Sequence, residues 1–122
     1  MTARRRRAIA MIDAVVGLNA VGGMVYALKG AEAVPTEWLE GSPFDDYRIP
    51  GLYLGTIVGG TCLAAAVAAA RDDRRAHAAA LASSAAMLSW IAVQVALIGY
   101  RSPLQPAIGA AGLTVGWLAG RD

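Results

Sequence analysis

The sequence predicts an all-α fold: an integral membrane four-helix bundle that forms one domain over residues 1–122. Of these residues 57% are hydrophobic and only 16% are charged, whereas a soluble domain has about 25% charged residues. The apolar residues are gathered into four long runs. The runs are unbroken, unlike the alternating strands of a membrane barrel, and therefore favour helices.

Each run is long enough, or nearly so, to cross a bilayer as a helix. The hydrocarbon core is about 30 Å thick and requires about 20 apolar residues. The expected spans are residues 8–28, 50–70, 78–98 and 103–120. The first contains one charged residue, Asp13, and the other three contain none. The fourth is the weakest candidate because it is short, rich in glycine and interrupted by Pro106.

The positive charges predict the orientation, because Lys and Arg near span ends accumulate on the cytoplasmic side. With four spans, eight of the 11 Lys and Arg residues lie on the side of the two termini, and three lie on the opposite side. The eight are Arg4, Arg5, Arg6, Arg7, Arg71, Arg74, Arg75 and Arg121, and the three are Lys29, Arg48 and Arg101. We therefore expect a multi-pass protein of the plasma membrane with both termini in the cytoplasm.

Glycine recurs at every fourth position in two of the expected spans. Residues 51, 55 and 59 share one face of the second span, and residues 112, 116 and 120 share one face of the fourth. Lipid supplies no hydrophobic force between helices, so close backbone approach at such faces holds them together. The pattern does not distinguish contacts within one chain from contacts between chains.

Polar side chains inside the spans need partners, because an unpaired polar group in hydrocarbon is costly. Asn19 and Gln94 are each expected to bond to a neighbouring helix, and lining a polar pocket is the alternative. Tyr26 lies on the same stripe of the first span as Asn19. Asp13 is expected to pair with the arginines at positions 4–7 or to contact water at the cytoplasmic interface. The alternative role for Asp13 is a proton or cation relay.

Residues 29–49 form the only sizeable connection and are expected to make an ordered cap on the outer face. A short helix is predicted over residues 34–39, with Pro35 near its first turn. Acidic and aromatic side chains gather in this connection, although their spacing matches no calcium loop. Structural capping is the first interpretation and contact with a ligand or ion is the second, for Glu37, Trp38, Asp45, Asp46 and Tyr47.

The run WLEGSPFDDYRIPGL at residues 38–52 resembles a family of small, functionally uncharacterised four-span bacterial membrane proteins. The first outer loop of that family has a pattern close to L-x-x-S-P-F-x-x-Y-x-x-P-G-L. The resemblance implies the four-span fold and the membrane location, and it brings no activity, cofactor or substrate. Many relatives have an Asp-Pro-Ser-Gly-like turn after the first span, where this chain has residues 29–32, KGAE.

The sequence offers little chemistry beyond these features. Cys62 is the single cysteine and His77 the single histidine, so no catalytic residue, metal ligand or cofactor is predicted, and no nucleic-acid partner. The favoured function is non-enzymatic: helix–helix contacts as a small subunit or homo-oligomer. One alternative is a binder, carrier or enzyme for an apolar small molecule or lipid in an intramembrane pocket under the outer loop. Its polar contacts would be Asn19, Tyr26, Gln94 and the loop acids. The other alternative is ion or proton transport through Asp13.

Overall fold

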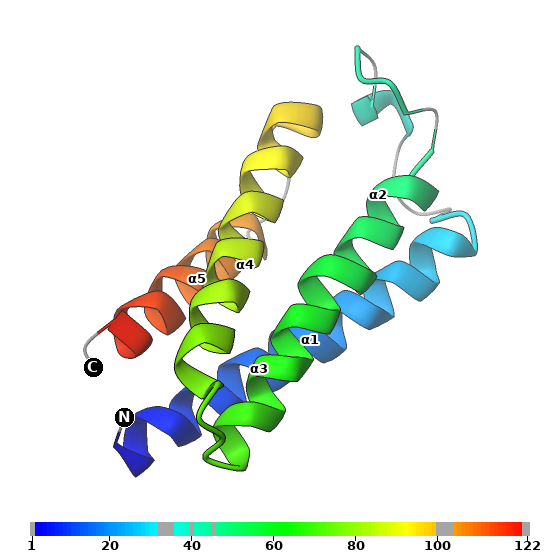
Figure 1. Ribbon diagram of the computed structural model, residues 1–122. Coiled ribbons are helices and arrows are strands. Elements are labelled where there is room, and N and C mark those ends of the chain that lie inside the picture. The colour runs from blue at the N-terminus through cyan, green and yellow to red at the C-terminus, as the bar shows by residue number, and fades with distance from the viewer. Residues whose placement is uncertain (1, 32–35, 40, 45, 100–103, 121–122) are drawn as a thin grey trace.

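The structure, a computed structural model, describes residues 2–31, 36–39, 41–44, 46–99 and 104–120. Within those ranges the chain is helical and contains no strand (Figure 1). Two short segments, η1 and η2, are a 3-10 helix and a π-helix. In chain order the elements are α1 (Ala3–Leu28), η1 (Thr36–Leu39), α2 (Arg48–Tyr53), η2 (Leu54–Gly59), α3 (Gly60–Ala70), α4 (Ala76–Ile98) and α5 (Leu104–Gly120).

The first helix begins earlier than the apolar run predicts. The side chain of Thr2 accepts a hydrogen bond from the backbone N–H of Arg5 at 3.2 Å and so caps the helix. The four arginines therefore lie in the first turns of α1. At the other end the N–H of Gly30 bonds to Ala27 O at 3.0 Å, and Gly30 adopts φ +110°. A left-handed glycine in this position ends the helix where the sequence predicts.

The second predicted span is one continuous helical rod made of α2, η2 and α3. The rod begins at Arg48, two residues before the predicted start. Its middle six residues form a π-helix that the sequence does not predict. Within or beside that segment, the hydroxyls of Thr56 and Thr61 donate to the carbonyls of Leu52 and Ile57, four residues back. Back-bonding of this kind slightly destabilises and often bends an α-helix, and here it occurs where the rod departs from α-helical geometry.

Within the described ranges, three helices are long and apolar enough to cross a membrane: Ala3–Leu28, Arg48–Ala70 and Ala76–Ala96. The predicted membrane character is supported by the outer surface of α1, where Met11 and Val15 are 70% and 69% exposed. The third predicted span begins two residues early, at Ala76. The fourth is α5, with 17 residues. Pro106 does not interrupt α5, because it lies in the first turn, where its missing N–H costs no helical hydrogen bond.

The glycine faces pack against neighbouring helices of the same chain. A Cβ atom added to Gly51 would lie 2.3 Å from Ala27 Cβ, and one added to Gly55 would lie 2.5 Å from Met24 Cβ. A Cβ atom added to Gly112 would lie 3.1 Å from Met87 Cβ on α4. The missing side chains therefore let α1 approach the α2–α3 rod and let α5 approach α4.

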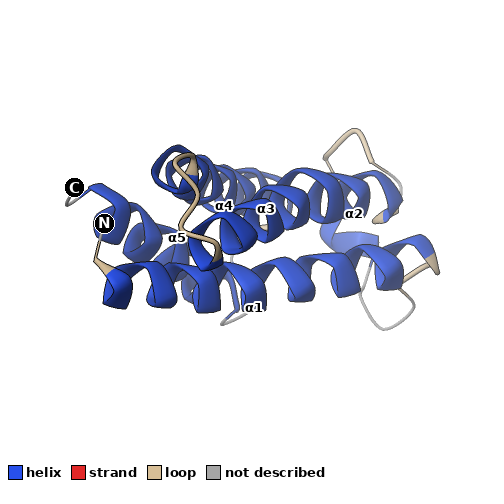
Figure 2. Ribbon diagram, turned by 60° about the horizontal axis from the view of Figure 1, so that its bottom comes forward, coloured by secondary structure: helices blue, strands red, loops and turns tan. Residues whose placement is uncertain are grey.

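The four rods are arranged as two tight pairs. α1 packs along α2, η2 and α3, and α4 packs along α5. Figure 1 shows the rod and α4 close together near residues 71–75, the turn that joins them, and diverging toward the opposite end. Figure 2 shows α1 along one side of the other helices, with the first turns of α1 near the last turns of α5. The pairs thus form a V that opens toward the 29–47 connection.

The close contact between Gly51 and Ala27 yields a stability prediction. Gly51→Ala should lower the free energy of unfolding by about 1–3 kcal/mol, because a rigid Ala27 Cβ cannot move aside. Gly60→Ala is the matched control, since nothing lies within 4 Å of a Cβ at that position. The control should be neutral or stabilising by up to about 1 kcal/mol. Unfolding in mixed micelles, followed by circular dichroism, measures both, and equal stability of the two variants would contradict the packing described.

Candidate functional site

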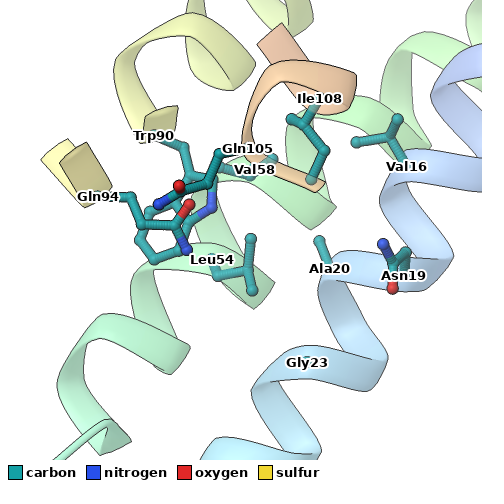
Figure 3. Close-up of a pocket in the computed structure, with 10 residues that line it drawn as sticks. All are labelled: Val16, Asn19, Ala20, Gly23, Leu54, Val58, Trp90, Gln94, Gln105 and Ile108. Carbon is teal, nitrogen blue, oxygen red and sulfur yellow. The ribbon is translucent and has the colours of Figure 1, made fainter. Parts of the chain in front are cut away.

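A cavity of about 210 Å³ lies where the two helix pairs diverge (Figure 3). Its walls come from α1, η2, α4 and α5. Among the described lining residues, three side chains are carboxamides, the others are largely apolar, and none is charged. The lining residues are Val16, Asn19, Ala20, Gly23, Leu54, Val58, Trp90, Gln94, Gln105 and Ile108.

Small residues on α1 and the π-helix together create this space. Ala20 and Gly23 share a face of α1 and leave little side chain to fill the gap. A Cβ added to Gly23 would lie 2.9 Å from Leu54 Cδ2, so Leu54 lies directly over this glycine. Leu54 and Val58 both belong to η2. The unpredicted π-helix therefore supplies one wall of the pocket.

Trp90 forms another wall and is held by Tyr53. The two rings stack with centroids 5.7 Å apart and an angle of 23°. The Tyr53 hydroxyl lies 3.1 Å from Ser89 Oγ, and Ser89 Oγ donates to Ala86 O at 3.0 Å. Because a serine has one hydroxyl hydrogen, Tyr53 is the donor to Ser89. Tyr53 thus connects α2 to α4 and fixes the indole, although sequence reasoning identified neither residue as part of a site.

The three carboxamides differ in their partners. Gln105 Nε2 donates to Gly99 O at 3.0 Å and ties the start of α5 to the end of α4. Asn19 is exposed and Gln94 is half-buried. Their predicted interhelical partners are absent: among the described residues no hydrogen bond reaches either side chain. Figure 3 places Gln94 and Gln105 on the same side as Trp90, with Asn19 across the pocket on α1.

The other predicted ligand contacts that the structure describes do not line the pocket. Tyr26 is 45% exposed on α1. In the connection Glu37 is exposed, whereas Trp38, Asp46 and Tyr47 are half-buried. Asp45 lies outside the described residues. Of the predicted contacts that the structure describes, only Asn19 and Gln94 line the pocket.

The described parts of the connection are held by local bonds. Asp46 accepts a hydrogen bond from Arg48 N at 3.0 Å and lies 3.9 Å from the Arg48 guanidinium. Ser42 Oγ donates to Leu39 O at 2.6 Å. Leu39 is 3% exposed, and its 3-10 helix contacts α4. The short helix predicted over residues 34–39 is thus seen as η1 over Thr36–Leu39, and residues 34 and 35 lie outside the described ranges.

Asp13 is buried between helices, and this corrects the expectation of an arginine or water contact. Its side chain is 0% exposed and faces α3 and α4. Asp13 Oδ2 lies 3.0 Å from Ser83 Oγ, and the Cys62 thiol also interacts with the carboxyl. Arg6 instead donates to Ala69 O at 3.0 Å and pairs with Asp72 at 3.3 Å. The reason is geometric: Asp13 shares the buried stripe of α1 with Ile9 and Val16.

Comparisons with protein-family models, with curated proteins and with solved structures give no match for this chain. The resemblance of residues 38–52 to a four-span bacterial family therefore stays a prediction.

The stacking of Tyr53 on Trp90 yields a spectroscopic prediction. In a protein whose only tryptophan is Trp90, made with Trp38→Phe and Trp117→Phe, Tyr53→Leu should increase the motion of the indole. Loss of an aromatic pair costs about 0.5–1.5 kcal/mol. Time-resolved fluorescence anisotropy should decay faster in Tyr53→Leu and remain close to the parent in Tyr53→Phe, which keeps the ring. An unchanged decay in Tyr53→Leu would mean that Tyr53 does not hold the indole.

Proposed function

We propose that this chain is a four-span protein of the plasma membrane, with both termini in the cytoplasm. We further propose that it binds a neutral, largely apolar small molecule or lipid in the pocket between its helix pairs. The pocket would lie in the outer half of the bilayer, on the side of the 29–47 connection.

The fourth span is supported by the packing of α5. Its 17 residues are at the lower end of the roughly 17–25 that cross a bilayer. It contacts α4 through Gly112 and Gly116, and Ser84 Oγ donates to Gly112 O at 2.7 Å. Such close contact between small residues is typical of helices packed within lipid. The arginine-rich end of the V then faces the cytoplasm.

The observation that carries the binding function is the pair of amides, Asn19 and Gln94, that receive no hydrogen bond from the described residues. At about 1.5 Å per residue, Asn19 lies about 16 Å along the axis from Ala8, the first residue of the apolar run. That places it near the middle of a core about 30 Å thick. An amide without a hydrogen bond at that depth costs about 1–3 kcal/mol or more. A ligand that bonds to both amides would remove this cost.

The lining defines the chemistry of the ligand. No charged side chain of the described residues faces the pocket, and this favours a neutral ligand over an ionic headgroup. The volume of about 210 Å³ exceeds the roughly 150 Å³ of a cavity that takes up benzene and falls below the roughly 300 Å³ of a typical drug-sized site. One ring or a short acyl segment fits, with a hydroxyl, carbonyl or amide group for Asn19 and Gln94. The described lining has no acid–base or nucleophilic group, which favours a binder over an enzyme.

The helix-contact function that the sequence favours remains a prediction. Its main support, the glycine faces, is weaker because Gly51, Gly55, Gly59, Gly112 and Gly116 all contact neighbouring helices of the same chain.

Binding is tested by quenching of Trp90 fluorescence. The protein that retains Trp90 as its only tryptophan is placed in lipid nanodiscs and titrated with a terminally brominated medium-chain alcohol. A bromoalkane of the same chain length, which lacks the hydroxyl, serves as the reference probe. We expect saturable quenching by the alcohol at lower concentration than by the alkane. The double variant Asn19→Leu, Gln94→Leu should weaken binding of the alcohol about tenfold, since two hydrogen bonds contribute about 1–3 kcal/mol.

The matched control is Thr114→Val, which also removes a polar group from a helix but lies outside the pocket. It should bind the alcohol like the parent. Equal, non-saturating quenching by alcohol and alkane in the parent protein would reject the pocket as a binding site.

The orientation is tested by cysteine labelling in intact cells. In a Cys62→Ala background, Ser42→Cys should react with a membrane-impermeant maleimide added outside, because residue 42 belongs to the outer connection. Asp73→Cys, in the turn between α3 and α4, should react only after the cells are broken. The positions are comparable because neither Ser42 nor Asp73 lies in a helix. Labelling of Asp73→Cys from outside would reverse or reject the proposed topology.

A further inference from the structure

A second polar cluster lies inside the bundle, away from the pocket. It consists of Asp13 on α1, Cys62 on α3 and Ser83 on α4, and all three side chains are 0% exposed. The cluster is a separate feature because none of its members lines the pocket. Asp13 Oδ1 has no hydrogen-bond partner within the described part of the chain. This combination of burial and an unpartnered oxygen requires an account of the charge on Asp13.

Counting hydrogens within the cluster leads to that account. Ser83 Oγ lies 2.9 Å from Ala80 O and 3.0 Å from Asp13 Oδ2. A backbone carbonyl can only accept, and a serine hydroxyl has a single hydrogen to donate. If that hydrogen goes to Ala80 O, the hydrogen between Ser83 and Asp13 must come from the aspartic acid. We infer that Asp13 is a proton-binding site: it holds a proton on Oδ2 and donates it to Ser83 Oγ.

The surroundings of Asp13 favour the same protonation state. An ionised carboxylate in the membrane interior needs a counter-charge or water. From α3 the carboxyl meets the Cys62 thiol and from α4 it meets the Ser83 hydroxyl. No cation from the described residues pairs with it, and Arg6 on its own helix is occupied by Asp72 and Ala69. A neutral acid satisfies the chain from Asp13 through Ser83 to Ala80 without any buried charge.

The proton-binding site lies one helical turn below the floor of the pocket. Val16 and Val58 line the pocket. Asp13 lies three residues before Val16 on α1, and Cys62 lies four residues after Val58 on the α2–α3 rod. Toward the arginine-rich end, the cluster is covered by three side chains that are 0% exposed, those of Ile9, Ala69 and Ala80. The proton is therefore enclosed by apolar side chains on both sides.

Infrared spectroscopy of the protein in lipid bilayers at neutral pH tests this inference. We expect a carbonyl stretching band of a protonated carboxylic acid that Asp13→Asn removes. Ser83→Ala should move the band to higher frequency, because the acid loses its hydrogen-bond acceptor. Asp46→Asn is the control and should leave the band unchanged, since Asp46 is exposed enough to pair with Arg48. In Asp13→Asn, the asparagine amide has nearly the same shape as the carboxylic acid that it replaces.

Isotopic labelling keeps the test decisive if Asp13→Asn does not fold. In the parent protein grown on aspartate labelled with ¹³C at the carboxyl carbon, the same band should shift to lower frequency, and Ser83→Ala should still move it. A spectrum at neutral pH without any protonated-acid band sensitive to Asp13 or Ser83 would overturn the inference. Quenching of Trp90 by the brominated alcohol does not depend on this result, so the two proposals can fail separately.

Discussion

Close backbone contact between α1 and the α2–α3 rod is the interaction on which the rest of the structure depends. Lipid does not drive helices together, so van der Waals contact and hydrogen bonds must hold them. Gly51, Gly55 and Gly59 let the rod approach Ala27, Met24 and Val21. This contact fixes the orientation of α1 about its own helix axis. The same orientation turns Ala20 and Gly23 toward the pocket and Asp13 toward α3 and α4.

The pocket follows from having two tight pairs that meet over only part of their length. α4 contacts α3 strongly but η2 weakly, and η2 is where the pocket begins. Tyr53 spans this gap by stacking on Trp90 and bonding to Ser89. Tyr53 thus bridges the opening between the pairs beside the cavity.

Much of the fold could be predicted from the sequence because long apolar runs and glycine spacing directly reflect the bilayer thickness and the helix period. The four runs give helices whose ends differ by a few residues, for instance at Ala3, where Thr2 caps α1. The site was harder to predict. Polarity alone identified Asn19 and Gln94. Nothing in the sequence near Trp90 or Gln105 indicated that these two residues line the same pocket. The π-helix and the burial of Asp13 depend on how the helices are rotated against each other, which hydropathy does not record.

The polar side chains of the four rods fall into two kinds: those with a partner in the protein, and those without a hydrogen bond from the described residues. Asp13 is the most costly group to bury, yet it is enclosed completely and has Ser83 as a partner. Asn19 and Gln94 are less costly, yet they line a cavity with no hydrogen bond from the described residues. A bundle selected only for packing would satisfy or replace these amides first, because apolar side chains at both positions would fill the cavity and remove the unpaired groups. The small molecule that we propose for this cavity would give both amides their missing hydrogen-bond partners.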